Sequence, residues 1–194
     1  NHEITNPMTT MIETQKVNGI DTDALRQAIA TVTQDPSHGQ TRWSVASHWC
    51  GGTRSEARVT GVMLGGQTIP REFTIGVDEP LELFGTNRFA NPQEHLLAAL
   101  NACMIVGYAA FCALEGITLE ELRITTAGDI DLRGFMGIDP TVKPGYGELA
   151  YTVHIKGNGT AEQFAEIHRR VMATSPNYFN LATSIPLRSR LVVG

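Results

Sequence analysis

Strand-like and helix-like patterns of apolar residues follow one another in separate blocks along this chain. Residues 41–50 are rich in Trp and Val, residues 54–64 are more polar, and residues 67–77 alternate between apolar and polar positions. Paired glycines at 51–52 and 65–66 separate these runs and favour tight turns. This part of the sequence therefore predicts three consecutive β-strands.

The longest apolar run predicts a helix that begins near Pro92 and ends near Gly116. From Leu96 to Leu114 it carries no charged side chain, so all its faces are largely apolar. The run is long enough to cross a membrane, but it has no Lys or Arg at either end and small residues dominate it. We therefore expect no membrane span. A soluble chain must instead enclose this helix on every side, which indicates that a second subunit contributes.

A second pair of strands and a second helix follow. Period-two alternation over residues 122–132 and 149–155 predicts the strands. The Gly- and Pro-rich loop 134–146 between them is long enough to line a site. Thr160, with Gln163 three positions later, forms a capping-box sequence that predicts the start of the helix.

The predicted order of elements is an appendage over residues 1–40, three strands, the long helix, two strands, a second helix, and a last strand over residues 185–193. A short helix capped by Asp21 or Thr22 is expected in the appendage. Strands are clustered and do not alternate regularly with helices. The sequence therefore predicts an α+β fold with mainly antiparallel sheets, formed by residues 41–194 as one domain.

Net charge and cysteine content limit the classes of function. A net charge of -5 without a basic stripe argues against nucleic-acid binding. The three cysteines lack a CxxC spacing, which indicates a reducing compartment, and the polar N-terminus lacks the apolar segment of a signal peptide. We therefore expect a cytoplasmic protein.

Candidate chemistry centres on Cys103, in the middle of the long helix. A thiol in apolar surroundings is usually inert, and it becomes a nucleophile only when a cation or a hydrogen-bond donor holds its thiolate. His95 lies about 12 Å away along a straight helix, and Cys112 lies on the opposite side. Partners must come from other elements or another chain, and Arg is favoured because it keeps its charge. Paired metal-ligand spacings are absent from the sequence, so we expect no metal.

The segment from Pro92 to Cys103, PQEHLLAALNAC, resembles the NPEELLAAALAAC segment of the OsmC/Ohr family of osmotically inducible and organic-hydroperoxide-resistance proteins. The spacing from Pro to Cys is the same, and the predicted order of elements matches that fold over residues 41–193. The resemblance implies a homodimer in which both chains wrap two central helices. It also implies thiol-dependent peroxidase chemistry without a cofactor.

The resemblance carries functional roles onto some positions better than onto others. Cys103 falls on the peroxidatic cysteine. Arg54, beside a Gly-Gly turn, is the best match for the catalytic arginine, and Arg42 is the alternative. Gln93 stands where the family has the carboxylate that orients this arginine, and Glu94 follows it directly. A Gln hydrogen-bonds an Arg without offsetting its charge, which would favour the Cys103 thiolate still more.

The resolving cysteine of the family opens a Cys-Pro motif, and here Ser175 precedes Pro176 instead. No disulfide can form at that place. Either an external thiol reduces a Cys103 sulfenate, or Cys50 substitutes as the resolving cysteine, or peroxidase activity has been lost.

Two functions follow from these observations. We favour reduction of organic hydroperoxides by Cys103, because the expected pocket walls are apolar. The alternative is a noncatalytic relative that binds a small apolar ligand at the dimer interface. The side chains expected to wall the pocket are Met104, Phe111, Phe135, Tyr178 and Phe179.

Overall fold

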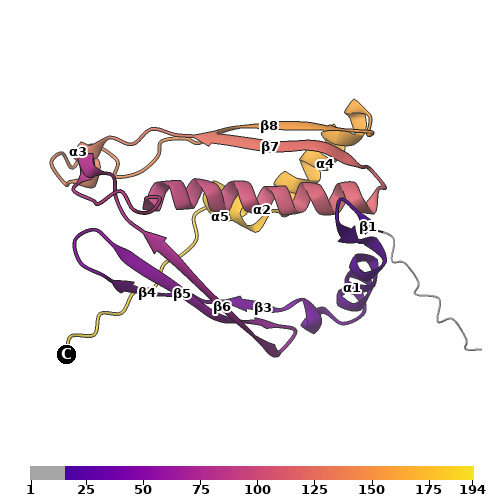
Figure 1. The fold of residues 1–194 in the computed structure, drawn as a ribbon, viewed down its shortest axis with the longest axis horizontal. Coiled ribbons are helices and arrows are strands. Elements are labelled where there is room, and N and C mark those ends of the chain that lie inside the picture. The colour runs from indigo at the N-terminus through magenta and orange to yellow at the C-terminus, as the bar shows by residue number, and fades with distance from the viewer. Residues whose placement is uncertain (1–15) are drawn as a thin grey trace, which may run out of the picture.

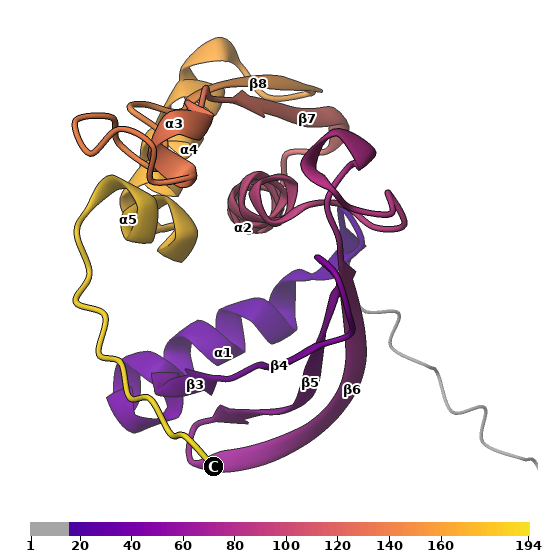
Figure 2. The same cartoon turned by 90° about the vertical axis from the view of Figure 1, so that its left-hand side faces the viewer.

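In the computed structural model, which describes residues 16–194, the long helix α2 runs between two β-layers (Figure 1). The sheet formed by β3 to β6 lies on one side of α2, and β7 and β8 lie on the other with α4 and α5 beside them (Figure 2). The predicted α+β class with antiparallel pairing is confirmed. The elements are β1 (Lys16–Val17), β2 (Ile20–Asp21), α1 (Thr22–Gln34), a 3-10 helix (Pro36–Gly39), β3 (Thr41–Trp43), β4 (Ala46–Trp49), β5 (Ser55–Leu64), β6 (Gln67–Val77), a 3-10 helix (Leu81–Leu83), α2 (Pro92–Leu114), β7 (Leu119–Ala127), α3 (Leu132–Phe135), β8 (Ala150–Gly157), α4 (Ala161–Thr174) and α5 (Pro176–Ala182).

The N-terminal sheet has β5 at its centre and an interrupted strand at one edge. β3 and β4 lie end to end along one side of β5, and β6 pairs along the other side. Trp43 pairs with Val62 and Ala46 pairs with Arg58. Two residues of the first run therefore face three residues of β5, and the ladder breaks there. The run predicted as one strand over residues 41–50 thus forms two short strands.

Helix α2 begins and ends where its terminal residues dictate. Asn91 is the N-cap: its side chain accepts a hydrogen bond from the backbone N–H of Glu94 at 2.9 Å. The Glu94 carboxylate accepts the backbone N–H of Asn91 at 2.7 Å in return, which completes a capping box. Pro92 occupies the first turn, where its missing N–H costs nothing. Gly116, with a φ of 71°, ends the helix in the left-handed region.

One stripe of α2 forms the core of the molecule. Positions four residues apart on this stripe are almost completely buried, and they pack against β7 and α4. The core members are Leu100, Met104, Tyr108, Cys112, Ile117, Ile124, Ile167 and Val171. Gly107 lets α4 approach closely, because a Cβ at this position would lie 3.3 Å from a methyl group of Val171.

The opposite side of α2 remains open to solvent, although it is apolar. Val106 is 68% exposed, Leu96 is 38% exposed, and Ala99 and Ala102 are also exposed. By length and composition alone, the helix could cross a membrane. Only 28% of an apolar stretch of 18 residues within it is buried in one chain. One chain therefore covers only part of the helix that we expected to be enclosed on every side.

The N-terminal sheet is equally open. Trp43, Trp49 and Phe73 are more than half exposed. One copy of the chain thus leaves large apolar surfaces uncovered.

The N-terminal part of the described chain attaches to the C-terminal end of α2. Asn18 donates to the carbonyl of Ile117 and accepts from the N–H of Leu119, both at 2.9 Å. Asp21 caps α1 as one of the two expected residues, accepting from the N–H of Ala24. The polar residues 1–15, from which we expected no signal peptide, lie outside the described residues.

The last predicted strand does not form. Residues 183–194 have no regular secondary structure, and Leu187, Leu191 and Val193 are each at least 82% exposed. A strand needs a neighbouring edge to satisfy its backbone groups, and among residues 16–194 no strand pairs with this segment. The alternation of apolar and polar residues therefore predicted a strand that a single chain does not form.

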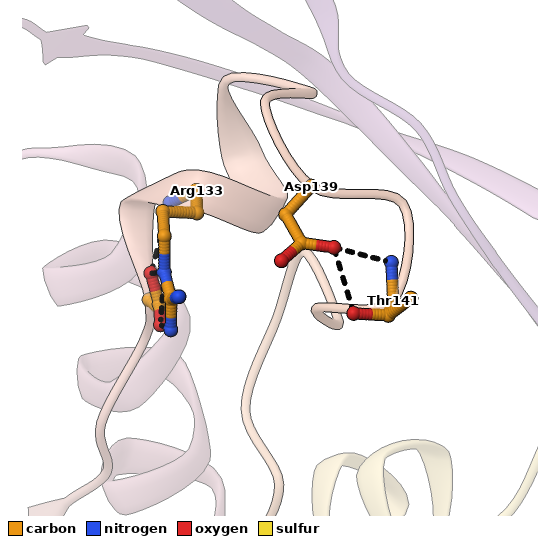
Figure 3. A network of polar contacts seen from close by, with 4 residues as sticks. Arg133, Asp139 and Thr141 are labelled. Carbon is orange, nitrogen blue, oxygen red and sulfur yellow. Dashed lines mark hydrogen bonds and ion pairs between the residues drawn. The ribbon is translucent and has the colours of Figure 1, made fainter.

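Short carboxylate contacts hold the loop between β7 and β8 (Figure 3). Asp131 caps α3 and forms an ion pair with Arg133, whose hydrogen bonds lower the pKa of Asp131 to about 2. Asp139 accepts hydrogen bonds from the N–H and the hydroxyl of Thr141 at 2.9 and 2.7 Å.

Asp78 is a completely buried carboxylate at the end of β6. It accepts hydrogen bonds from the hydroxyls of Thr53 and Thr86 and from the backbone N–H groups of Thr86 and Arg88. The Thr86 hydroxyl is the main cause that holds the pKa of Asp78 well below its usual range, and burial opposes it. Asp78 thereby joins the β4–β5 turn to the loop that precedes α2.

We expect Asp78 to make stability depend on pH in the acid range. Its folded pKa is depressed, so its contribution is complete above the unfolded pKa of about 3.9 and is lost as pH falls toward the folded value. Asp78→Asn should lower the free energy of unfolding at pH 7, and its difference from the parent should shrink from pH 5 to pH 2. Urea titrations across this range measure it, with exposed Asp129→Asn as the control. A pH-independent difference would contradict this role.

Candidate active site around Cys103

Cys103 lies at the boundary between the buried stripe of α2 and its open side. The residue is partly exposed, while its neighbour Met104 is completely buried. Cys112, the other cysteine of the helix, is also completely buried, and burial raises the pKa of its thiol to about 11. Of the two helix thiols, Cys103 is therefore the one that a solute can reach.

Ser175 contacts the sulfur of Cys103 directly. The Ser175 hydroxyl donates to Cys103 Sγ at 3.3 Å across 72 residues of sequence. Ser175 is only 5% exposed and is the N-cap of α5, where its Oγ accepts from the N–H of Tyr178 at 3.4 Å. Asn177 ties α5 to α2 by donating to the carbonyl of Ala99 at 2.9 Å.

A groove of about 430 Å³ opens one helical turn from Cys103. Leu100, three residues before the cysteine, lines this groove. The rings of Tyr151 and Tyr178, which also line it, meet edge to face at a centroid distance of 6.3 Å. The lining residues are Leu100, Tyr146, Gly147, Glu148, Leu149, Tyr151, Tyr178, Leu181 and Ala182. The walls are predominantly apolar, as a pocket for an alkyl or aryl group requires.

Arg54 lies with Cys50 in the β4–β5 turn. Its guanidinium donates to the carbonyl of Cys50 at 3.0 Å, and the backbone N–H of Cys50 donates to the carbonyl of Arg54 at 2.9 Å. Thr53 in the same turn donates to buried Asp78. The structure therefore brings together two predicted site residues, Arg54 and Cys50, but it places neither in contact with Cys103 of the same chain.

The alternative arginine, Arg42, lies at the other end of the same sheet. It pairs with Met63 of β5, whereas Arg54 directly precedes Ser55 at the opposite end of this strand. Eight residues of strand separate the two ends by about 27 Å at ~3.4 Å per residue. Arg42 and Arg54 of the same chain therefore cannot both contact one thiol.

The match to a protein-family model covers residues 85–190, and that model describes an OsmC-like protein. It spans more than half of the chain. The chain belongs to the OsmC-like family.

Solved structures support the fold. An OsmC-like protein from Mycoplasma pneumoniae is 18% identical with a TM-score of 0.56, and the alignment covers 73% of this chain and 87% of that chain. An OsmC-like protein of unknown function from Vibrio cholerae is 12% identical with a TM-score of 0.53, covering 71% of this chain and 92% of that chain. Among curated proteins, no sequence matches this chain.

The two residues that the OsmC-like resemblance offered for orienting the arginine lie on the first turn of α2. Glu94 is occupied by the capping box with Asn91, and Gln93 is exposed. Neither forms a hydrogen bond with Arg54, whose guanidinium is bound to the carbonyl of Cys50. Within one chain, these residues do not assemble the arginine cluster that the family pattern implies.

Of the five side chains expected to wall the pocket, one lines the groove. Tyr178 lines the groove, whereas Met104 belongs to the core and Phe135 lies on α3 with 68% of its surface exposed. Phe111 packs under the guanidinium of Arg170, with 4.2 Å between the guanidinium carbon and the ring centroid. Phe179 is more than half exposed and is absent from the groove lining.

Sequence reasoning missed the contact between Ser175 and Cys103, and it missed α5. The Ser-Pro dipeptide was a usable signal, because Ser is a preferred N-cap and Pro favours the first turn. Among residues 16–194, no three His, Cys, Asp or Glu side chains lie close enough together to hold a metal ion.

Proposed function

We propose that this OsmC-like protein reduces organic hydroperoxides with Cys103 as its single reacting thiol. The observation that carries the proposal is the partly exposed Cys103, which lies one helical turn from an apolar groove. Its sulfur accepts a hydrogen bond from Ser175, at the position where the family has a second thiol. The groove suits the organic part of a hydroperoxide better than it suits hydrogen peroxide. No cofactor or metal is required.

The chemistry balances with an external thiol as reductant. The Cys103 thiolate attacks one oxygen of the O–O bond, which breaks; the sulfur is oxidised to a sulfenate, and the alcohol leaves after taking up a proton. The sulfenate takes up a proton from solvent to become the sulfenic acid, a thiol from solution attacks its sulfur, and water leaves as a mixed disulfide forms. A second thiol releases Cys103 and leaves as the oxidised disulfide.

We also propose that the working unit is a homodimer. The open apolar side of α2 and the exposed residues of the N-terminal sheet are surfaces that a second copy would cover. Within its own chain Arg54 donates to the carbonyl of Cys50 and forms no hydrogen bond with Cys103, so we propose that the arginine serving Cys103 is Arg54 of the second copy. Two α2 helices packed antiparallel would enclose both apolar sides and bring each β4–β5 turn toward the other subunit.

A second candidate function is noncatalytic binding of a small apolar ligand in the same groove. It is favoured by the apolar lining of the groove and by the engagement of Arg54 away from Cys103. For either function we expect a soluble, cytoplasmic protein without nucleic-acid partners, in keeping with a net charge of -5.

The first test is the product of oxidation. One equivalent of cumene hydroperoxide should add one oxygen to Cys103, which dimedone then traps, because Ser175 cannot resolve a sulfenate. Intact mass spectrometry and peptide mapping measure this, with Cys103→Ser as the control that should gain no adduct. Oxidation by hydrogen peroxide should be slower.

Two other outcomes of this test have defined meanings. A loss of two hydrogens that maps to Cys50 and Cys103 would make Cys50 the resolving cysteine, and Cys50→Ser would abolish it. If Cys103 stays unmodified in excess hydroperoxide, the thiol is structural and the ligand-binding function replaces the peroxidase.

The second test concerns the arginine. Arg54→Met should slow the oxidation of Cys103 about tenfold or more, since a neighbouring guanidinium shifts the pKa of an acidic group by about 1–3 units. Arg42→Met should leave the rate within about twofold, because Arg42 is at the other end of the sheet. Stopped-flow rates at pH 7 measure both variants. A larger effect at Arg42 would reverse the assignment.

A further inference from the structure

The Ser175 hydroxyl has one hydrogen, and its surroundings decide where that hydrogen points. A backbone N–H can only donate, so the contact from Tyr178 uses Ser175 Oγ as an acceptor. The remaining contact of Oγ is with Cys103 Sγ at 3.3 Å. Once Cys103 is a thiolate, its sulfur can only accept, and the hydroxyl hydrogen must then lie on the line between oxygen and sulfur.

Burial and packing fix this donor in place. Ser175 is 5% exposed, and its own N–H donates to the carbonyl of Val171 at 2.8 Å. Among the residues that the structure describes, Ser175 is the side chain with a hydrogen bond to the Cys103 sulfur. A hydrogen bond to a charged group is stronger than one between neutral groups, and more so where water is excluded.

We infer that Ser175 is a catalytic residue that donates its hydroxyl hydrogen to the Cys103 thiolate and, after oxidation, to the sulfenate. The donation to the sulfenate rests on the proposed function, whereas the donation to the thiolate does not. The serine is thus not merely a missing resolving cysteine. A cysteine thiol at this position would consume the sulfenate by forming a disulfide. The serine hydroxyl instead stabilises the sulfenate anion until an external thiol arrives.

Thiolate reactivity tests the first half without any peroxide. In a Cys50→Ser background, iodoacetamide reports on Cys103, because Cys112 is buried. Ser175→Ala should slow alkylation at pH 7 about tenfold and move its pH profile upward by about one unit, as expected for the loss of a hydrogen bond to a charged group. Ser175→Thr should restore most of the rate.

Matched variants separate this role from packing. Asn177→Ala removes the tie from α5 to α2 but leaves the donor at Cys103, so its pH profile should match the parent. Ser175→Asp keeps a capping oxygen for α5, removes the donor and adds a like charge, so its profile should move upward at least as far as that of Ser175→Ala. If Ser175→Ala and Ser175→Asp both keep the parental profile, or if Asn177→Ala reproduces the shift, the inference is overturned.

The oxidised state is tested by the lifetime of the sulfenate. After one equivalent of cumene hydroperoxide, Ser175→Ala should lose its dimedone-reactive sulfenate several-fold faster than the parent.

The Ser175→Cys variant should instead lose two hydrogens, because the introduced thiol forms a disulfide with Cys103. Equal sulfenate lifetimes in Ser175→Ala and the parent would overturn the second half. If no variant reacts with hydroperoxide while the alkylation shift is present, the proposed function fails and the thiolate donor stands.

Discussion

The enclosure of α2 is the constraint on which the rest of this structure depends. A helix without a charge from Leu96 to Leu114 gains stability only where its side chains leave water, at about 25 cal/mol for each Å² of apolar surface buried. One chain buries one stripe, from Leu100 to Cys112, under β7 and α4. The other side, with Val106 at its centre, stays in contact with solvent. The fold is therefore organised around a helix of which a single copy covers only one side.

The position of Cys103 follows from that constraint. It lies between the stripe that the chain covers and the side that it leaves open, so its sulfur reaches both a buried donor and a solute. Ser175 comes from the covered side, through the junction of α4 and α5. Arg54 is held beside Cys50 in its own chain and forms no hydrogen bond with Cys103 there.

Local signals in the sequence predicted local structure well. Alternation and glycine pairs gave the bounds of β6, and the capping box at Thr160 gave the start of α4. The features that the sequence did not predict depend on contacts between residues far apart along the chain. The contact between Ser175 and Cys103 spans 72 residues and needs packing of α5 on α2. Residues 183–194 alternate like a strand, but no strand among residues 16–194 pairs with them. The hydrogen bond of Arg54 to the carbonyl of Cys50 depends on the turn that holds both residues.

The most direct measurement of the central claim is the mass of the protein in solution, by sedimentation equilibrium across the micromolar range. If a second copy completes the enclosure of α2, the protein sediments at twice the 21.1 kDa of one chain at every concentration, and Val106→Asp weakens the assembly and lowers the unfolding temperature together. A folded monomer at micromolar concentration, with the thermal stability of an ordinary domain, would contradict the claim. The open side of α2 would then need no partner.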